Sequence, residues 1–404
     1  MHHSSVASAT NTSPKRKRGK LPSLPSLALR ASVRYGILLL AMTGCIAPKT
    51  LPPIVIGHIA PRTGPLREQG LAAEAAIRLA VTAANDSEEK VAGRTLEVRH
   101  PDNAGKPEAA QSVAVRLLAV GNLAALIGDG DSASAERLCR LAGQYKTPVL
   151  APVWLPPAAL GAYGFSIGSS PADRGQALAR AAVEQLGACE VLVLTDTRSP
   201  EFLALTAAFV EQVGSKARVR RLDFSSDDDL LQHLQREAGN KHAAVLAAGN
   251  VADLERVHGL LRGPDPGERP PVLLYGGPED ARLARLADAW SEGRALYWTM
   301  AFAPDALTPQ ALAFARAYEA RTQRPPDTAA LLAYDAAGML ITALRGMEGA
   351  KDGKVKLRDE LLKLKDYESL SGPLTFDKNQ AVSRPVSVVH RVGDRVQTLR
   401  PSAK

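Results

Sequence analysis

The sequence predicts an α/β protein built from two doubly wound parallel-sheet lobes that are joined by a hinge of several chain segments. From residue 54, short β-branched and aliphatic runs alternate with amphipathic stretches of helical length. The alternation restarts near residue 172 and breaks in the C-terminal third. Parallel strands need helical crossovers, so each regular block predicts one parallel sheet covered by helices on both faces.

The first block opens with the apolar strand Ile54–Ala60 and a Gly-Pro turn. A helix is expected over about 68–84, where Ala72, Ala76 and Leu79 share one face. The remaining elements are expected, in chain order, as a strand at 96–99, a helix at 108–120, a strand at 124–127, a helix at 134–144, and strands at 149–150 and 164–167.

The second block repeats this arrangement without a clean sequence repeat. Its elements are expected as a helix at 172–186, a strand at 191–194, a helix at 202–213, a strand at 217–224, a helix from 227, a strand at 243–246, a helix at 253–261, a strand at 272–275 and a short helix from 279. Asp227, Asp228 and Asp229 open one helix, where acids suit the positive end of its dipole. An acidic metal site is the weaker interpretation of that run.

The C-terminal third departs from the alternation. Its elements are expected as a strand at 296–299, helices at 310–322, 328–345 and 356–364, and strands at 374–376, 386–391 and 395–399, the last two joined by a hairpin turn at Gly393-Asp394. Residues 54–168 and 297–369 are assigned to lobe 1, and residues 169–296 and 370–404 to lobe 2. Several crossings between lobes make a hinge, and a hinge predicts a cleft.

The N-terminal segment predicts export. Residues 1–44 combine a basic leader with a short apolar run, which is typical of a signal peptide and too short for a transmembrane helix. Small residues precede Cys45, as in the bacterial lipoprotein signal that this segment resembles, so Cys45 is the expected lipidation site and 45–53 the tether. The alternative is a buried free cysteine after a core helix.

The leader also accounts for the net charge of +8. Seven of the 50 Lys and Arg residues lie in residues 1–34, which contain no acid, so 43 basic residues face 42 acidic residues in the remainder. The excess charge therefore belongs to the leader and argues against a nucleic-acid partner. The run Lys15–Arg18 could otherwise indicate a nuclear-localisation or polyanion patch.

No catalytic or metal-binding motif stands out. The histidines beyond the leader never fall at metal-ligand spacing, and no phosphate-binding P-loop is present. We therefore expect no enzyme, no metal and no cofactor, although catalysis without such a motif stays open. Cys139 and Cys189 lie within apolar patterns and are expected to be buried thiols.

The segment from Gly128 to Ser134 runs from a strand end into a Ser-rich helix start. Backbone N–H groups and hydroxyls at a helix N-terminus favour a negatively charged ligand group, and ligands of open parallel sheets bind at the carboxyl ends of strands. The alternative is simple capping, with Ser132 as the N-cap.

An ordered set of short motifs resembles the type 1 periplasmic-binding-protein superfamily, close to the branched-chain amino-acid (Leu/Ile/Val) receptor group of ABC importers. The resemblance covers about residues 52–399. It rests on Ile54–Pro65, Ile127-Gly128 with Ser132, Thr147–Pro152, Leu194–Asp196, Gly276-Gly277, Ala333–Ala336 and Leu370–Asp377.

The resemblance implies an interlobe ligand site, with Ser132 at the carboxylate-binding serine of the amino-acid receptors. Several positions depart from the family pattern, since Leu155 replaces a hydroxyl residue and no tyrosine stands near Glu201. A desolvated α-ammonium and α-carboxylate need matched partners, so these departures argue against a free branched-chain amino acid. The candidate lining residues, each with an alternative role in capping or in the core, are Thr63, Gln69, Ser132, Ala133, Val153, Trp154, Leu155, Arg198, Asn250 and Gly277.

These features predict an exported, lipid-anchored solute-binding protein that faces the periplasm. It would close around a small polar ligand, amino-acid-like, an amide or related, for an ABC permease or a sensor. The membrane would be reached only through the N-terminal lipid. The alternative is a ligand-free interaction lipoprotein that docks on a cell-wall synthase or another envelope partner.

Overall fold

The computed structural model describes residues 51–400, apart from 120–121, 129, 238–239, 241, 261–271, 278–282, 284–285, 288–294, 306, 348–352 and 394. Residues 50–404 form one compact unit, which is separate from residues 1–49. The leader, Cys45, residue 394 of the expected hairpin turn and most of the helix expected from residue 279 lie outside the described residues. No helix in the described part of the chain is long and apolar enough to cross a membrane.

The first sheet has five parallel strands in the order β2-β1-β3-β4-β5. Their bounds are β1 Ile54–His58, β2 Leu96–Arg99, β3 Leu123–Ile127, β4 Val149–Ala151 and β5 Gly164–Ser166. Every residue of β1 is buried, as expected for a strand covered on both faces.

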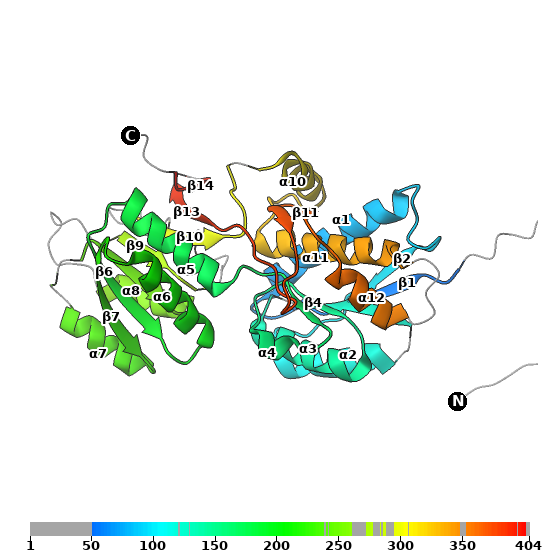
Figure 1. Cartoon of the computed structure of the whole chain (residues 1–404), viewed down its shortest axis with the longest axis horizontal. Coiled ribbons are helices and arrows are strands. Elements are labelled where there is room, and N and C mark those ends of the chain that lie inside the picture. The colour runs from blue at the N-terminus through cyan, green and yellow to red at the C-terminus, as the bar shows by residue number, and fades with distance from the viewer. Residues whose placement is uncertain are drawn as a thin grey trace, which may run out of the picture. The chain divides into compact units, whose positions relative to one another are not determined.

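Helices cover both faces of this sheet (Figure 1). They are α1 Arg67–Asp86, α2 Pro107–Ala119, α3 Ser132–Tyr145, α4 Pro157–Leu160, α10 Pro309–Thr322, α11 Thr328–Arg345 and α12 Gly353–Leu362. Side chains of a strand alternate between faces, and accordingly Ile54 and Ile56 join the core under α1 and α11. Val55 joins the core under α2 and α3.

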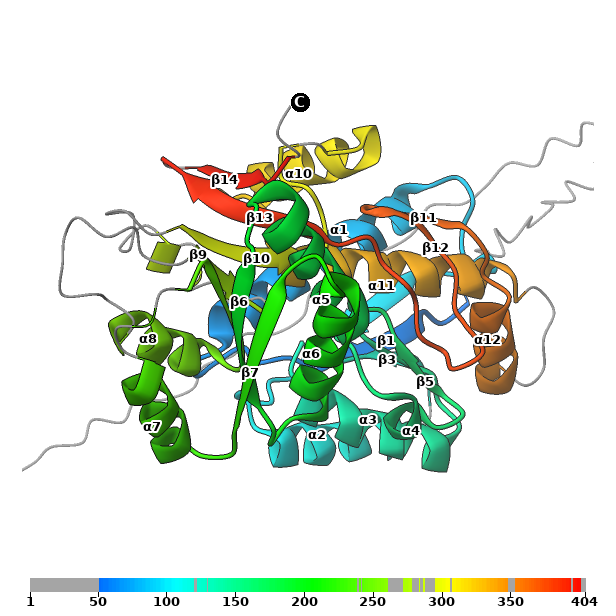
Figure 2. The same ribbon diagram turned by 60° about the vertical axis from the view of Figure 1, so that its left-hand side comes forward.

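The second sheet has seven strands in the order β14-β13-β10-β9-β8-β6-β7. The parallel strands are β6 Glu190–Asp196, β7 Arg218–Phe224, β8 Ala244–Ala248, β9 Val272–Tyr275 and β10 Leu296–Met300. β13 Ser387–Val392 and β14 Arg395–Thr398 add an antiparallel edge, visible beside β10 in Figure 2.

Helices again flank this sheet on both faces. They are α5 Pro171–Arg180, which continues as the π-helical turn η1 Ala181–Gln185, then α6 Pro200–Val213, α7 Asp227–Glu237 and α8 Val251–Leu260. Val191 and Val193 of β6 face one core and Leu192 and Leu194 face the other. The α/β class with two mainly parallel sheets is therefore confirmed.

The chain passes between the two sheets three times. The first crossing joins β5 to α5, the second follows β10, and the third leads from Val382 to β13. β10 pairs in the seven-stranded sheet, whereas Leu370, Leu374, Phe376 and Val382 belong to the core under α1 and α11. Sheet pairing and packing thus set the two later crossings beyond the expected boundaries at 296/297 and 369/370. A short hairpin, β11 Tyr367–Ser369 with β12 Gly372–Leu374, precedes the third crossing.

Arg384 ties two of these crossings to the part of the molecule that contains the first sheet. Its side chain is fully buried and pairs with Asp335 of α11, Nη1 to Oδ2, at 2.8 Å. The same side chain donates from Nε to the carbonyl of Ile167 at 3.2 Å and from Nη1 to Oγ of Ser371 at 2.5 Å. Asp335 also accepts from the N–H of Leu370 at 3.0 Å. One buried arginine therefore fixes the ends of two hinge segments.

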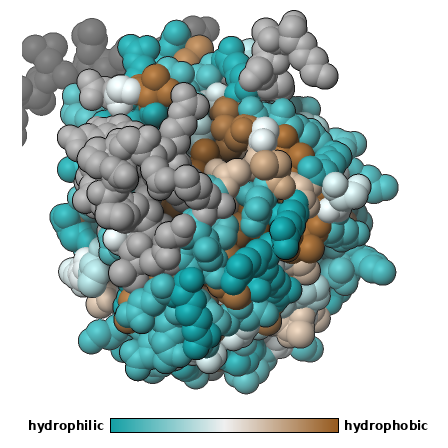
Figure 3. Space-filling view, turned by 90° about the vertical axis from the view of Figure 1, so that its left-hand side faces the viewer, coloured by the Kyte–Doolittle hydropathy of each residue, from teal (hydrophilic) through white to brown (hydrophobic). Residues whose placement is uncertain are grey.

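The edge strand β7 has a polar character. Its exposed residues include Arg218, Arg220 and Arg221, and charged side chains discourage pairing with another strand. Figure 3 views the molecule from the side on which β7 and α7 lie in Figure 1, and most of the coloured surface there is hydrophilic.

The two described cysteines differ. Cys139 is buried, and burial raises the pKa of its thiol to about 12. The prediction for Cys189 is wrong, because this residue is exposed. It lies between η1 and the start of β6, where the chain turns at the surface before entering the sheet.

Candidate functional site

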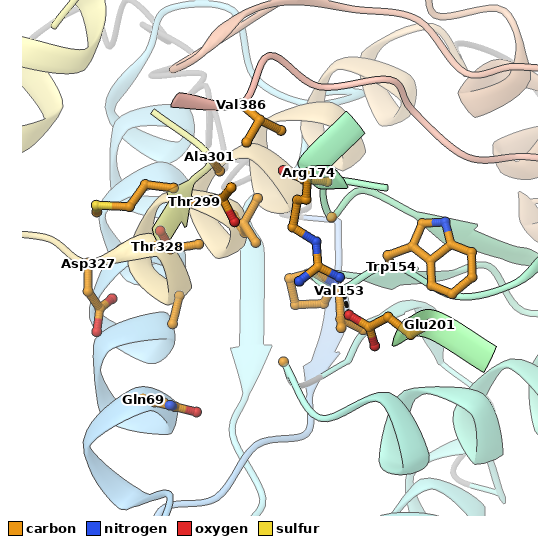
Figure 4. Close-up of a pocket in the computed structure, with 17 residues that line it drawn as sticks. Gln69, Val153, Trp154, Arg174, Glu201, Thr299, Ala301, Asp327, Thr328 and Val386 are labelled. Carbon is orange, nitrogen blue, oxygen red and sulfur yellow. Dashed lines mark hydrogen bonds and ion pairs between the residues drawn. The ribbon is translucent and has the colours of Figure 1, made fainter. Parts of the chain in front are cut away.

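A cavity of about 150 Å³ opens where the carboxyl ends of strands from both sheets meet (Figure 4). The segments after β3, β4 and β5, the end of β10 and the first turns of α1, α5, α6 and α11 all contribute to its wall. This is the expected position for a ligand of an open parallel sheet. The lining residues are Gln69, Gly130, Pro152, Val153, Trp154, Gly168, Ser169, Arg174, Glu201, Thr299, Met300, Ala301, Asp327, Thr328, Ala329, Leu332 and Val386.

Arg174 is the central charged group of the cavity wall. It stands in the first turn of α5, a helix capped by Ser170, whose Oγ accepts from the N–H of Asp173 at 3.0 Å. The Arg174 residue is only 7% exposed. Nη1 donates to the carbonyl of Gly277 at 2.9 Å and Nη2 pairs with Glu201. Nε is buried and has no hydrogen-bond partner among the described residues.

Glu201 reaches Arg174 from the neighbouring helix. It lies in the first turn of α6, where the helix dipole favours a carboxylate. α5 and α6 approach closely because Gly175 has no side chain: a Cβ there would lie 2.3 Å from the carbonyl oxygen of Leu205. The glycine therefore brings the two helix starts together and with them the ion pair, which Figure 4 shows as a dashed line.

The opposite wall carries uncharged hydrogen-bonding groups and one acid. Asp327 is the N-cap of α11 and accepts from the N–H of Ala330 at 2.8 Å. Burial raises the pKa of the Asp327 carboxyl. Gln69 of α1 and Thr328 of α11 lie on the same wall, so both donors and acceptors face the cavity there.

The loop after β4 supplies Val153 and Trp154. Oγ of Ser166 fixes this loop by donating to the carbonyl of Val153 at 2.9 Å and accepting from the N–H of Leu155 at 3.1 Å. Gly168 allows a close approach, since a Cβ there would lie 2.4 Å from the backbone nitrogen of Trp154. With Met300, Ala301, Leu332 and Val386 these side chains form the apolar part of the wall.

Three of the ten residues predicted from the sequence line the cavity: Gln69, Val153 and Trp154. Trp154 is half-buried in the cavity wall. Gly277 does not line the cavity, but its carbonyl holds Arg174.

Four of the remaining residues have other partners in this structure. Leu155 is 1% exposed and belongs to the core under α2 and α3. Thr63 donates from Oγ1 to Asp102 at 2.6 Å. Arg198 pairs with Asp196 at 2.8 Å, and Asn250 accepts from the N–H of Asp253 at 3.1 Å near the start of α8. The structure thus places these four side chains in local contacts outside the cavity wall.

Ser132 and Ala133 lie in the first turn of α3, outside the lining residues. The alternative role for Ser132 as N-cap is wrong, because Asp131 caps the helix and accepts from the N–H of Ser134 at 2.7 Å. An aspartate side chain reaches the same backbone groups as a serine, and it precedes the helix by the required single position.

Sequence reasoning missed the charged residues Arg174, Glu201 and Asp327. Each belongs to a helix start marked by a sequence signal, since Pro171 and Pro200 occupy first turns and Asp327 is a capping residue. Charged residues at such helix starts are a usable signal for the wall of a site, and two of the three helices, α5 and α6, follow strands. In the described part of the chain, no group of three or more His, Cys, Asp or Glu side chains could hold a metal ion.

Comparisons with known proteins agree with this architecture. Isoleucine-bound LivJ from Streptococcus pneumoniae shares 22% identity, with 86% of this chain and 100% of that chain covered and a TM-score of 0.70. The leucine-binding protein LivK from Thermotoga maritima shares 23% identity, with 85% of this chain and 97% of that chain covered and a TM-score of 0.70. A solute-binding protein from R. palustris in complex with benzoate shares 18% identity, with 86% of this chain and 95% of that chain covered and a TM-score of 0.66.

No curated protein matches the chain. The model of a family described as periplasmic binding protein, however, matches residues 53–394. That span includes the first sheet, every strand of the second sheet except the edge strand β14, all three crossings between the sheets and every residue of the cavity wall. The chain therefore belongs to the periplasmic binding protein family.

Proposed function

We propose that this protein is an extracytoplasmic solute-binding protein of an ABC importer or a sensor. The observation that carries the proposal is the cavity, which is lined from both sheets at the carboxyl ends of their strands. A ligand held there contacts both halves and stabilises their closed arrangement without covalent chemistry. The apolar wall beside a few polar groups suits a small organic molecule.

The proteins with similar folds support a ligand of this size. Solved relatives were crystallised with isoleucine, leucine, benzoate and 3,4-dihydroxybenzoate. Isoleucine, leucine and benzoate share a compact apolar body with one polar end, and 3,4-dihydroxybenzoate carries two further hydroxyls on its ring. An apolar body with a polar end fits the cavity of this chain, which combines an apolar wall with a few polar groups.

The location follows from the N-terminal segment. A basic leader, a short apolar run and Cys45 support export and a lipid anchor at the cell envelope. The described body would then face the periplasm on a short tether.

A thermal-shift screen of the purified protein tests solute binding. The compounds are amino acids, amides, short peptides and aromatic acids, and a true ligand at 100 times its Kd should add about 2.7 kcal/mol of stability. Val153→Trp fills the cavity and should abolish the shift. Val115→Trp places the same side chain at an exposed site on α2 and should preserve it.

A shift that survives in the Val153→Trp variant would show that the compound binds elsewhere. If no compound from a broad screen stabilises the unsubstituted protein, solute binding fails. The ligand-free role, docking on a cell-wall synthase or another envelope partner, would then take its place.

A further inference from the structure

The cavity wall has an unusual charge balance. Among the described lining residues only Arg174, Glu201 and Asp327 ionise. Arg174 and Glu201 pair directly, with side chains 9% and 19% exposed, so they cancel each other inside the wall. Asp327 accepts a backbone N–H at the N-terminus of α11, where the positive end of the helix compensates its charge.

This balance disfavours a ligand with net charge. An anion would be desolvated beside two carboxylates, and the one cation of the wall is already paired. A cation would be desolvated beside the Arg174 guanidinium, and the two carboxylates already have partners in Arg174 and in the backbone N–H at the start of α11. A ligand without net charge avoids both costs.

The pair nevertheless keeps hydrogen-bonding capacity. Nε of Arg174 donates to no described residue, and a charged donor buried without a partner is destabilising. The Glu201 carboxylate offers about four acceptor positions, and its Oε1 is the oxygen that holds Arg174. The pair therefore keeps one unused donor, the covered Nε of Arg174, and unused acceptor positions on Glu201.

We propose that the Arg174–Glu201 pair selects the ligand by charge and admits a compact molecule of zero net charge that accepts from Arg174 and donates to Glu201. A primary amide or a zwitterion has this pattern. The inference rests on the proposed solute-binding function and deepens it. Protein atoms cover Nε in the structure, so the ligand's acceptor reaches it when the Arg174 side chain shifts as the two halves close.

The volume and the apolar wall limit the ligand body. An engineered apolar cavity of about 150 Å³ in another protein binds benzene. The cavity here has a comparable volume of about 150 Å³, bordered by Val153, Trp154 and Leu332. One ring, or a branched chain of similar size, is therefore the expected body.

Three probes with one body and different polar ends test the inference: benzamide, benzoate and benzylammonium. Binding is measured by calorimetry on the purified protein and on its variants Glu201→Gln and Arg174→Gln. The unsubstituted protein should bind benzamide best. In Glu201→Gln the benzoate-to-benzamide affinity ratio should rise by at least about tenfold. The Arg174 guanidinium then lacks its charged partner and can form a charged hydrogen bond with benzoate.

In Arg174→Gln the ratio of benzylammonium to benzamide should rise by a similar factor, about tenfold. If that variant does not fold, Glu201→Gln carries the test alone, since it preserves the shape of the side chain. Glu184→Gln is the matched control: Glu184 pairs with Lys216 on the surface at 2.7 Å, and its loss should leave the order of the three probes unchanged.

Preferred binding of benzoate or benzylammonium to the unsubstituted protein would overturn the inference. So would an unchanged probe order in Glu201→Gln, or the absence of binding by all three probes to every folded protein. Each of these three results leaves solute binding standing if the broad screen has found another ligand. Solute binding itself fails only when that screen is empty.

Discussion

At the scale of single residues, a buried histidine pair stands out beside the first sheet. His58 at the end of β1 and His100 after β2 share a hydrogen bond between their Nδ1 atoms at 2.9 Å. Both Nε2 atoms are buried without a partner among the described residues. Burial lowers the pKa of His58 well below its ordinary value of 6.5 and that of His100 to about 4.

The charged neighbours act in opposite directions on this pair. Arg62 and Arg78 lower the pKa of His100, whereas Glu74, which binds both arginines at 2.8 Å, raises it. The net pKa stays low, so the folded protein keeps both rings neutral while the unfolded chain takes up protons below about pH 6.5.

We expect the free energy of unfolding to fall as the pH drops from 6.5 towards 4. The His100 contribution is on the order of 2 kcal/mol, allowing for partial exposure of the ring. Urea denaturation at several pH values should therefore show a shallower decline for His100→Gln. His233→Gln, on α7, should match the unsubstituted protein. Equal slopes for His100→Gln and the unsubstituted protein would contradict this assignment.

At the scale of the elements, the hinge depends on Arg384. Replacing Arg384 by Met leaves Asp335 buried without its cation, and such a loss typically costs about 3–5 kcal/mol of stability. Urea denaturation of Arg384→Met should show a loss of about that size, and Asp335→Asn in the same chain should recover part of it. Arg140→Met removes the exposed pair with Glu136 and should cost at most about 1 kcal/mol. Equal losses for the two Arg→Met variants would show that the buried pair does not anchor the hinge.

Periodicity was a sufficient guide to most elements. β6 and β8 are runs of aliphatic residues buried on both faces, and the expected strands at 191–194 and 243–246 overlap both. The strand β10 was also expected at the observed place, but the expected boundary at 296/297 assigned most of it to lobe 1, whereas it pairs in the seven-stranded sheet. A short apolar run specifies a strand, whereas its partner strand is chosen by packing from distant segments.

At the scale of the whole molecule, the proposed lipid anchor depends on one thiol, that of Cys45. Cys45→Ser should abolish labelling of the protein by a radioactive fatty acid and move it from the membrane fraction to the aqueous fraction. Cys189→Ser changes the exposed cysteine of the body and should keep both properties. Labelling that persists in Cys45→Ser would place the lipid elsewhere or refute the anchor.

Sequence alone determined the α/β class, the order of most strands and helices, and the presence of two blocks, because these follow from local periodicity and turn residues. Tertiary structure decided which side chains form the cavity. Arg174 and Glu201 lie 27 residues apart and Asp327 comes from a third helix, so only the packing of helix starts brings them together. Ser132 lies at the start of α3, as the sequence indicated, but outside the cavity wall, and Leu155 packs in the core under α2 and α3.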